Sequence, residues 1–377
     1  MPASPDIFPD RRKAFLPQIE SFRGVAACVV AVNHILLALE HPNPTWEWRF
    51  LRQLFNGGGA VCIFFVLSGF VLGLSLDARR NNTPFFDYVQ FVTRRLFRLY
   101  PAYLASLTLI LIYVIWWHHP TVYPAASPWY NQWYHVLPTW SQAWDILTFK
   151  DISLNNIAWT LRSELICSCL LPFLHFINRR IGLLYNCGVL FLLIAVSHFV
   201  SAQFVGNLYF FYLGLMVPAV NRHPWFAKTS PPILFYLAFL VCYIGVIQSG
   251  RDDWAAYSVL RVLPGFAAFG LVCLVASERQ STIHKSLGSE LARFYGKISY
   301  SFYLLHFFVL YIVTANLLKI CSSDTITSQN YLFTGYLAAA TFLITTPLAW
   351  ISWRFIELPS TKMAKWLFNK NVFNNPA

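Results

Sequence analysis

The sequence predicts an all-α fold: a polytopic membrane helical bundle of about ten transmembrane helices, with both termini cytoplasmic. Three observations predict it. Hydrophobic residues make up 57% of the 377 residues and charged residues only 12%, whereas soluble domains are about 25% charged. Several segments are apolar over the ~20 residues that a helix needs to cross a bilayer. Lys and Arg are concentrated between these segments, on one side of the predicted membrane.

Ten apolar segments follow one another along the chain. They lie near residues 20–39, 57–77, 98–117, 158–177, 181–200, 204–221, 231–249, 256–276, 297–318 and 331–355. Only residues 201–203 separate the fifth segment from the sixth. The longest connection, residues 118–157, is rich in Trp, Pro and Tyr. A connection of that length and composition is expected to pack as an interfacial cap rather than as a separate domain.

The distribution of basic residues predicts the topology. If the N-terminus is cytoplasmic, 20 of the 28 Lys and Arg residues fall in inside segments and 5 in outside segments. The positive-inside rule then places both termini in the cytoplasm. The predicted parts are a cytoplasmic N-terminal segment (1–19), a transmembrane domain (20–359) and a cytoplasmic tail (360–377). The net charge of +12 is therefore interpreted as basic residues that orient the protein in the membrane and can contact anions. No nucleic-acid partner is expected.

The cysteines predict neither a disulfide framework nor a metal site. Seven of the eight fall in apolar segments. Cys167 and Cys169 lack a second cysteine pair or a histidine at zinc-ligand spacing. The first apolar segment is long enough to remain as a membrane anchor, and no cleavable signal peptide is apparent.

Two ionisable residues stand inside the first predicted span. Arg23 and His34 are eleven residues apart, which on an α-helix returns to about 20° from the start, so both side chains share one face. The rise between them is roughly 16 Å. Ionisable residues inside a membrane helix are costly and indicate a functional site. Arg23 is expected near the cytoplasmic boundary and His34, beside Asn33, in the outer half.

Glu164 is expected at the depth of His34, because the fourth span descends from the outer side. A histidine and a carboxylate at one depth suit a general base and its orienting group. The alternative is a buried ion pair that only fixes helix packing. Arg162 lies about 200° from Glu164 on the helix and cannot share its face.

Two further polar sets belong to other spans. Arg94, Arg95 and Arg98 are expected at the cytoplasmic start of the third span, where they offer charge to phosphate oxygens. They are equally the ordinary positive-inside signal. Ser299, Tyr303 and His306 share a stripe of the ninth span and are expected to point into the bundle. Structural hydrogen bonding is the alternative for all three. Ser68 and Gly69 of the second span are interpreted as a close helix contact.

Six motifs in order together resemble acyltransferase family 3, the integral-membrane acyltransferases that modify bacterial surface carbohydrates. They are Phe22-Arg23-Gly24 with His34, Phe65 to Phe70, Arg95-x-x-Arg98-x-x-Pro101, Trp159 to Glu164, Ser299 to His306, and Glu357-Leu358-Pro359. They cover the chain from about residue 20 to residue 359. The resemblance implies ten membrane helices and a multi-pass protein of the bacterial inner membrane. It does not extend to the extracytoplasmic hydrolase-like domain of some members, so a partner of that kind would be a separate chain.

The resemblance also implies an activity. The donor would be cytosolic acyl-coenzyme A, with acetyl-coenzyme A favoured, used as a co-substrate rather than bound permanently. The acceptor would be a hydroxyl of an envelope or exported carbohydrate, free or lipid-linked. His34 and Arg23 would be catalytic, and Arg95 and Arg98 would lie near the coenzyme. Chemistry fits this reading, because neutral His34 could take the proton of a hydroxyl that attacks the thioester.

Several roles stay open at this level. Glu164 could orient His34 or hold the acceptor, and Arg23, Asn33 or Tyr303 could stabilise the oxyanion. An acyl-enzyme relay is also compatible with the residues. The main alternative function is a transporter or flippase for an anionic or glycosylated lipid, which buried charges inside a helical bundle would also suit.

Overall fold

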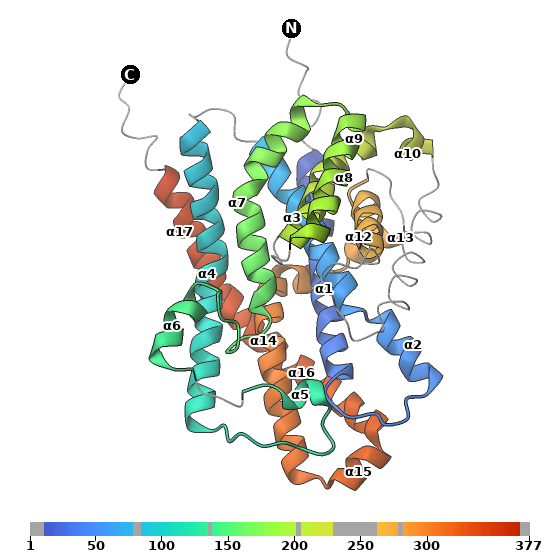
Figure 1. The fold of residues 1–377 in the computed structure, drawn as a ribbon, viewed down its shortest axis with the longest axis vertical. Helices are drawn as coiled ribbons and strands as arrows, with labels where there is room; N and C mark the ends of the chain where they lie inside the picture. Colours follow the sequence, from blue (N-terminus) through green and yellow to red (C-terminus); the bar gives the residue numbers. More distant parts are fainter. Residues whose placement is uncertain are drawn as a thin grey trace.

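A computed structural model describes residues 11–77, 84–134, 138–200, 205–228, 262–277 and 282–369. Helices account for nearly all regular structure in these ranges, and within them the only β-pairing is an isolated bridge between Leu39 and Ala126. The long helices run side by side in an elongated bundle (Figure 1), and the short helices α5, α6 and α15 lie toward one end of it. The predicted all-α fold is therefore confirmed.

The long helices are as follows: α1 Arg11–Leu36, α3 Gly57–Asp77, α4 Pro84–Trp116, α7 Ala158–Arg180, α8 Leu183–Phe199, α9 Val205–Arg222, α12 Val262–Val275, α14 Glu290–Ile320 and α16 Asn330–Ser352. The short helices are α2 Trp46–Leu54, α5 Pro128–Asn131, α6 Trp140–Leu147, α10 Pro224–Lys228, α13 Thr282–Leu287 and α15 Ser323–Ser328. A π-helical turn, Trp353–Glu357, joins α16 to α17 (Leu358–Asn369).

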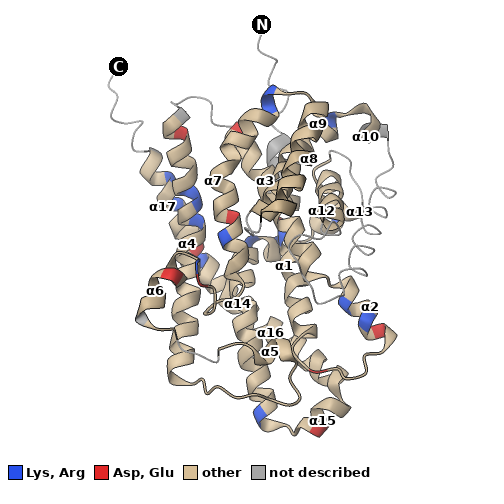
Figure 2. Ribbon diagram, viewed as in Figure 1, with Lys and Arg blue, Asp and Glu red and all other residues tan. Residues whose placement is uncertain are grey.

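Six helices of the described ranges are long and apolar enough to cross a membrane, and α8 and α12 are shorter apolar helices. Figure 2 shows long stretches of these helices free of charged residues, as a lipid-facing surface requires. The predicted span at 231–249 lies outside the described residues. The protein is thus a membrane protein built as a polytopic helical bundle.

The third predicted span was placed too late in the chain. It was expected to begin at residue 98, but α4 already begins at Pro84. The first turns of α4 carry Asp87, Gln90, Arg94 and Arg95, so their hydropathy is too low to be recognised as a span. Arg95 and Arg98 consequently lie roughly 16 to 21 Å along the helix rather than at its start.

The C-terminal segment contains a helix that packs on the bundle. Residues 360–369 continue as helix in α17, which packs against α4. The guanidinium of Arg94 lies 5.8 Å from the ring centroid of Phe368, and Phe368 meets Phe86 edge to face at 6.1 Å. Aromatic contacts of this kind explain why the helix continues beyond the last apolar residues.

Two glycine contacts fix the closest helix pairs. An added Cβ at Gly24 of α1 would lie 2.5 Å from the backbone nitrogen of Gly296 in α14. An added Cβ at Gly69 of α3 would overlap the carbonyl oxygen of Phe211 in α9, and Gly214 of α9 faces α3 in the same way. Small residues let membrane helices approach to backbone contact. The helix contact predicted around Ser68 and Gly69 is therefore present at Gly69.

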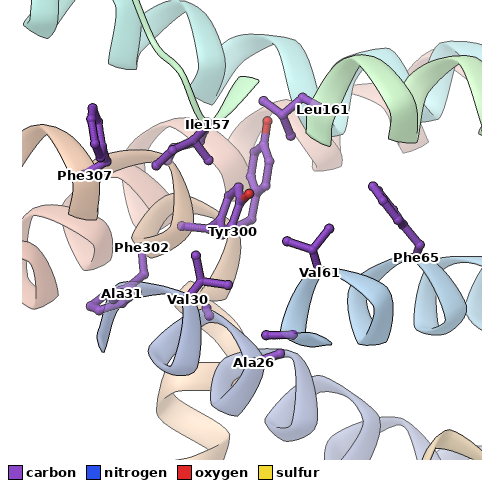
Figure 3. Packing of buried hydrophobic residues seen from close by; sticks show 14 of the residues in the cluster. Ala26, Val30, Ala31, Val61, Phe65, Ile157, Leu161, Tyr300, Phe302 and Phe307 are labelled. Atoms are coloured by element: carbon purple, nitrogen blue, oxygen red, sulfur yellow. The ribbon is translucent and has the colours of Figure 1, made fainter. Parts of the chain in front are cut away.

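The core lies where α1, α3 and α14 meet. Figure 3 shows Ala26 and Val30 of α1 beside Val61 of α3, with Tyr300 and Phe302 of α14 behind them. The small side chains of α1 leave room for the aromatic rings of α14, and the interior reaches close packing in this way. This junction holds the polar residues predicted from the sequence.

Residues 118–134 and 138–157 form a cap over the end of α1. Ser127 N donates to Ala38 O at 3.1 Å and Glu40 N donates to Ala125 O at 3.0 Å. Tyr130 is buried and its hydroxyl donates to Tyr311 O of α14 at 2.9 Å. The cap is therefore bonded to both α1 and α14, and it does not form a separate domain.

Candidate active site

A cluster of charged side chains lies inside the bundle. The carboxylate of Glu164 on α7 accepts a hydrogen bond from Nη2 of Arg95 on α4. Glu164 also accepts from Ser68 Oγ at 3.0 Å, and Arg95 Nε donates to Ser168 Oγ at 3.3 Å. Only 8% of the Arg95 side chain and 14% of the Glu164 side chain are exposed. A buried ion pair of this kind is stable only because both partners and their hydrogen bonds are present.

The cluster contains more positive than negative charge. Arg23 of α1 interacts electrostatically with Arg95, Arg98, Glu164 and Glu357, which gives three guanidinium groups and two carboxylates. Within the described ranges, the buried Nε atoms of Arg23 and Arg98 have no hydrogen-bond partner. Unpaired buried donors cost free energy. The cluster is therefore suited to hold an additional anionic or hydrogen-bond-accepting group.

Glu357 brings the C-terminal motif into this cluster. Its Oε2 accepts from Ser301 Oγ of α14 at 3.2 Å, and only 7% of the residue is exposed. It lies in the π-helical turn after α16, and such turns are frequent at functional sites. Tyr300 of α14 donates to the carbonyl of Leu99 on α4 at 2.6 Å. The hydrogen bonds of Tyr300 and Ser301 therefore hold α14 against α4 and against the π-helical turn.

A cavity of about 30 Å³ adjoins the cluster, which is room for only a few water molecules. Its lining comprises Arg23, Val61, Phe64, Phe65, Thr160, Leu161, Glu164, Ser299, Tyr300 and Tyr303. The Tyr303 hydroxyl lies 3.0 Å from Thr160 Oγ1 of α7. Two of the three polar residues predicted on α14, Ser299 and Tyr303, therefore face the same cavity as Arg23 and Glu164.

The third polar residue of α14 contacts His34. Nδ1 of His34 lies 2.9 Å from Nε2 of His306, and the two rings are nearly parallel. His306 is fully buried, and its Nδ1 lies 2.7 Å from the carbonyl oxygen of Tyr303. His34 is half-buried. The residues predicted separately on the first and ninth spans are thus brought together as a histidine pair.

Glu164, for which orienting His34 and holding the acceptor were both predicted options, contacts other groups in the structure. In the described part of the chain its carboxylate bonds to Arg95 and Ser68, while His34 bonds to His306. Glu164 lines the same cavity as Arg23 rather than lying beside His34, and its carboxylate is directed to α4 and α3. Arg162 points elsewhere, as expected, with Nη1 3.4 Å from Phe149 O of the cap.

Aromatic residues enclose His34. Trp129 of the cap stacks on its ring with centroids 5.2 Å apart, and Phe307 of α14 meets it edge-on at 5.8 Å. Trp133 packs against both Trp129 and Phe307. Sequence reasoning did not single out Trp129, and the only signal was the abundance of Trp in residues 118–157. Asn33, next to His34, packs against Gly57 at the start of α3.

A larger cavity, about 200 Å³, lies apart from these residues. It adjoins Asp77, which contacts His175 at 3.2 Å and Arg179 at 3.3 Å. None of the predicted site residues lines it. Size alone therefore does not identify the functional site. The smaller cavity is lined by Arg23, whose Nε has no partner within the described ranges, and by Tyr303, one helical turn before His306.

Comparison with known proteins identifies the family of the chain. A family profile described as "Acyltransferase domain" matches residues 16–354. The acyltransferase MdmB of Streptomyces mycarofaciens is 26% identical over 321 residues, which cover 78% of this chain and 79% of MdmB. BcsY of Komagataeibacter xylinus, described provisionally as a membrane-bound transacylase, is 31% identical over 112 residues, or 30% of this chain and 23% of BcsY. No solved structure matches the chain.

Proposed function

Because the chain belongs to acyltransferase family 3, a membrane acyltransferase acting on groups other than aminoacyl groups, we propose that it is an O-acyltransferase. The donor is cytosolic acyl-coenzyme A, acetyl-coenzyme A in particular. The acceptor is a hydroxyl of an envelope or exported carbohydrate, free or lipid-linked. Family membership favours transfer chemistry over the transporter or flippase alternative. The proposed location is the bacterial cytoplasmic membrane.

His34 is proposed as the general base. A neutral imidazole can accept the proton of the acceptor hydroxyl while the oxygen attacks the thioester carbon. Collapse of the tetrahedral intermediate then breaks the carbon–sulfur bond, and the proton passes from His34 to the departing thiolate. The products are the acyl ester and free coenzyme A. The observation that supports this assignment best is the pairing of half-buried His34 with His306, which holds the base within the bundle.

The arginine cluster is proposed to bind the donor. Arg23, Arg95 and Arg98 outnumber the two nearby carboxylates, and two of these guanidinium groups keep unpaired Nε donors within the described ranges. Arg98 is the better phosphate ligand, since Arg95 is already bonded to Glu164. Arg23 lies roughly 16 Å along α1 from His34, so it supports donor binding and does not contact the same reacting atoms. A pantetheine arm would bridge that distance.

Tyr303 and Asn33 are proposed as donors to the developing oxyanion. Asn33 adjoins His34 in sequence, and Tyr303 lies one helical turn before His306 and faces the cavity. Hydrogen bonds that strengthen as negative charge develops are a large contribution to acyl transfer. Ser299 faces the same cavity and would support the donor arm.

The test uses membranes that contain the protein. Acetyl-coenzyme A should release free coenzyme A when acceptor carbohydrate is present, and cells should lose one acyl group from a surface carbohydrate when the protein is removed. His34→Ala should abolish release, and Arg23→Ala should reduce it strongly. His119→Ala, an exposed histidine of the outer connection, is the matched control. Full acylation by His34→Ala would refute the general base.

A second measurement tests the donor site. Arg98→Ala should raise the apparent KM for acetyl-coenzyme A at normal protein abundance, because a charge-assisted contact to phosphate is lost. Lys319→Ala, at the end of α14, removes one positive charge away from the cluster and should leave KM unchanged. If the KM of Arg98→Ala is unchanged, the proposed donor site is wrong, and the arginines serve only to orient the helices in the membrane.

A further inference from the structure

The hydrogen bonds of His306 determine where its proton lies. Its Nδ1 is 2.7 Å from the carbonyl oxygen of Tyr303 and 3.3 Å from that of Phe302. A carbonyl oxygen can only accept a hydrogen bond. Nδ1 of His306 therefore carries the proton, and in the neutral ring Nε2 is left with a lone pair.

The same reasoning extends to His34. Its Nδ1 is 2.9 Å from Nε2 of His306. Because that Nε2 accepts, Nδ1 of His34 must be the donor and must carry the proton. The neutral ring of His34 then has its lone pair on Nε2. Within the described part of the chain, this Nε2 makes no hydrogen bond.

We propose that His306 is a positioning residue that fixes His34 in the tautomer whose Nε2 accepts the proton of the acceptor hydroxyl. The inference rests on the proposed function, in which His34 is the base. A neutral imidazole has two tautomers, and only the one with a free Nε2 presents a base on the side away from His306. The hydrogen bond from His34 to His306 selects that tautomer before substrate binds.

His306 also acts during the reaction. When Nε2 of His34 takes the hydroxyl proton, the ring becomes an imidazolium whose Nδ1–H still points at the lone pair of His306. No proton has to move between the two rings, and the positive charge is stabilised by a hydrogen-bond acceptor. This is the arrangement of a hydrolase triad, where a third group orients the histidine and stabilises its charged form. Here the third group is a neutral imidazole held by a backbone carbonyl.

Packing holds the pair in this geometry. His306 is fully buried and its ring stacks on Phe302 with centroids 6.2 Å apart. Trp129 of the cap stacks on His34. Both rings are thus restricted to small rotations, which is what a positioned base requires. The carboxylate of Glu164 is bonded to Arg95 and Ser68, whereas the partner of His34 Nδ1 is His306.

Two substitutions at position 306 separate positioning from packing. His306→Gln retains a side-chain carbonyl that can accept from His34 Nδ1, whereas His306→Phe retains volume and ring shape without an acceptor. Loss of an orienting partner should lower kcat by about 10²- to 10⁴-fold in His306→Phe, the range of general-base catalysis. The KM for acetyl-coenzyme A should change little. His306→Gln should recover a substantial part of kcat. Protein abundance and elution as a single species in detergent check folding in each variant.

The outcomes distinguish this inference from the proposed function. Normal kcat in His306→Phe, or equal losses in His306→Phe and His306→Gln with both folded, would overturn the positioning role. If His34→Ala is inactive and His306→Phe is not, the base assignment stands and the positioning role fails. If His34→Ala is fully active, the proposed function itself fails.

Discussion

Replacing Gly24 by alanine adds one carbon atom to the contact at which α1 crosses α14. That carbon would lie 2.5 Å from the backbone nitrogen of Gly296 and 2.6 Å from the carbonyl carbon of Tyr295. Ordinary contacts between such atoms begin near 3.5 Å, so the helices must part by about 1 Å. Overpacking of this kind costs about 1–3 kcal/mol. The better helix propensity of alanine returns up to about 1 kcal/mol, which leaves a net loss.

Activity should suffer more than stability. The histidine pair joins the same two helices, with 2.9 Å between His34 and His306. If the helices part by about 1 Å as rigid bodies, this distance approaches 4 Å and the hydrogen bond is broken. Gly24→Ala should therefore reduce kcat for coenzyme A release and lower the thermal unfolding midpoint in detergent.

The chain provides a matched control for this substitution. Gly335 of α16 has no atom within 4 Å of its would-be Cβ, so Gly335→Ala should gain helix propensity without a clash. Activity should be unchanged and the unfolding midpoint equal or higher. If Gly24→Ala behaves like Gly335→Ala in both measurements, then backbone contact between α1 and α14 does not set the geometry of the site.

Three further predictions concern the surroundings of the site. Glu164→Gln should destabilise the fold by about 3–5 kcal/mol, because it leaves buried Arg95 without its anion. Unfolding in detergent measures this loss of stability. The double variant Glu164→Gln, Arg95→Met should recover much of it. Trp129→Ala should increase coenzyme A release in the absence of acceptor, because water gains access to His34. The control is Trp144→Ala: Trp144 lies on α6 and is 70% exposed, and its replacement should not increase this release. Tyr130→Phe should cost about 1 kcal/mol of stability by removing one buried hydrogen bond to α14, with donor KM unchanged.

The arrangement of helices could be predicted because apolar length and charge asymmetry are local properties of the sequence. Arg23 and His34 illustrate the same point. Their spacing of eleven residues predicted one shared face, and in the structure both side chains face α14. Periodicity along a single helix is enough for such a prediction.

The partners of these residues could not be predicted in the same way. His34 and His306 are 272 positions apart, and no pattern within either helix indicates that they meet. Glu164 was expected at the depth of His34, but it lies beside Arg23 and Arg95, because the depth of a residue cannot be read from the sequence without knowing where its helix enters the membrane. The early start of α4 escaped prediction because polar residues lower its hydropathy while tertiary contacts with α17 extend the helix.

The two glycine contacts restrict how the interior can open. A cavity of about 30 Å³ is too narrow for a pantetheine chain, so if the donor binds here as proposed, some wall must yield. The backbones of α1 and α14 are in direct contact, and so are those of α3 and α9. These two helix pairs therefore form the parts of the cavity wall that resist displacement. The compliant wall is therefore α7, which contributes Thr160, Leu161 and Glu164 to the lining. Its outward displacement would strain the ion pair between Glu164 and Arg95 and so pull on α4.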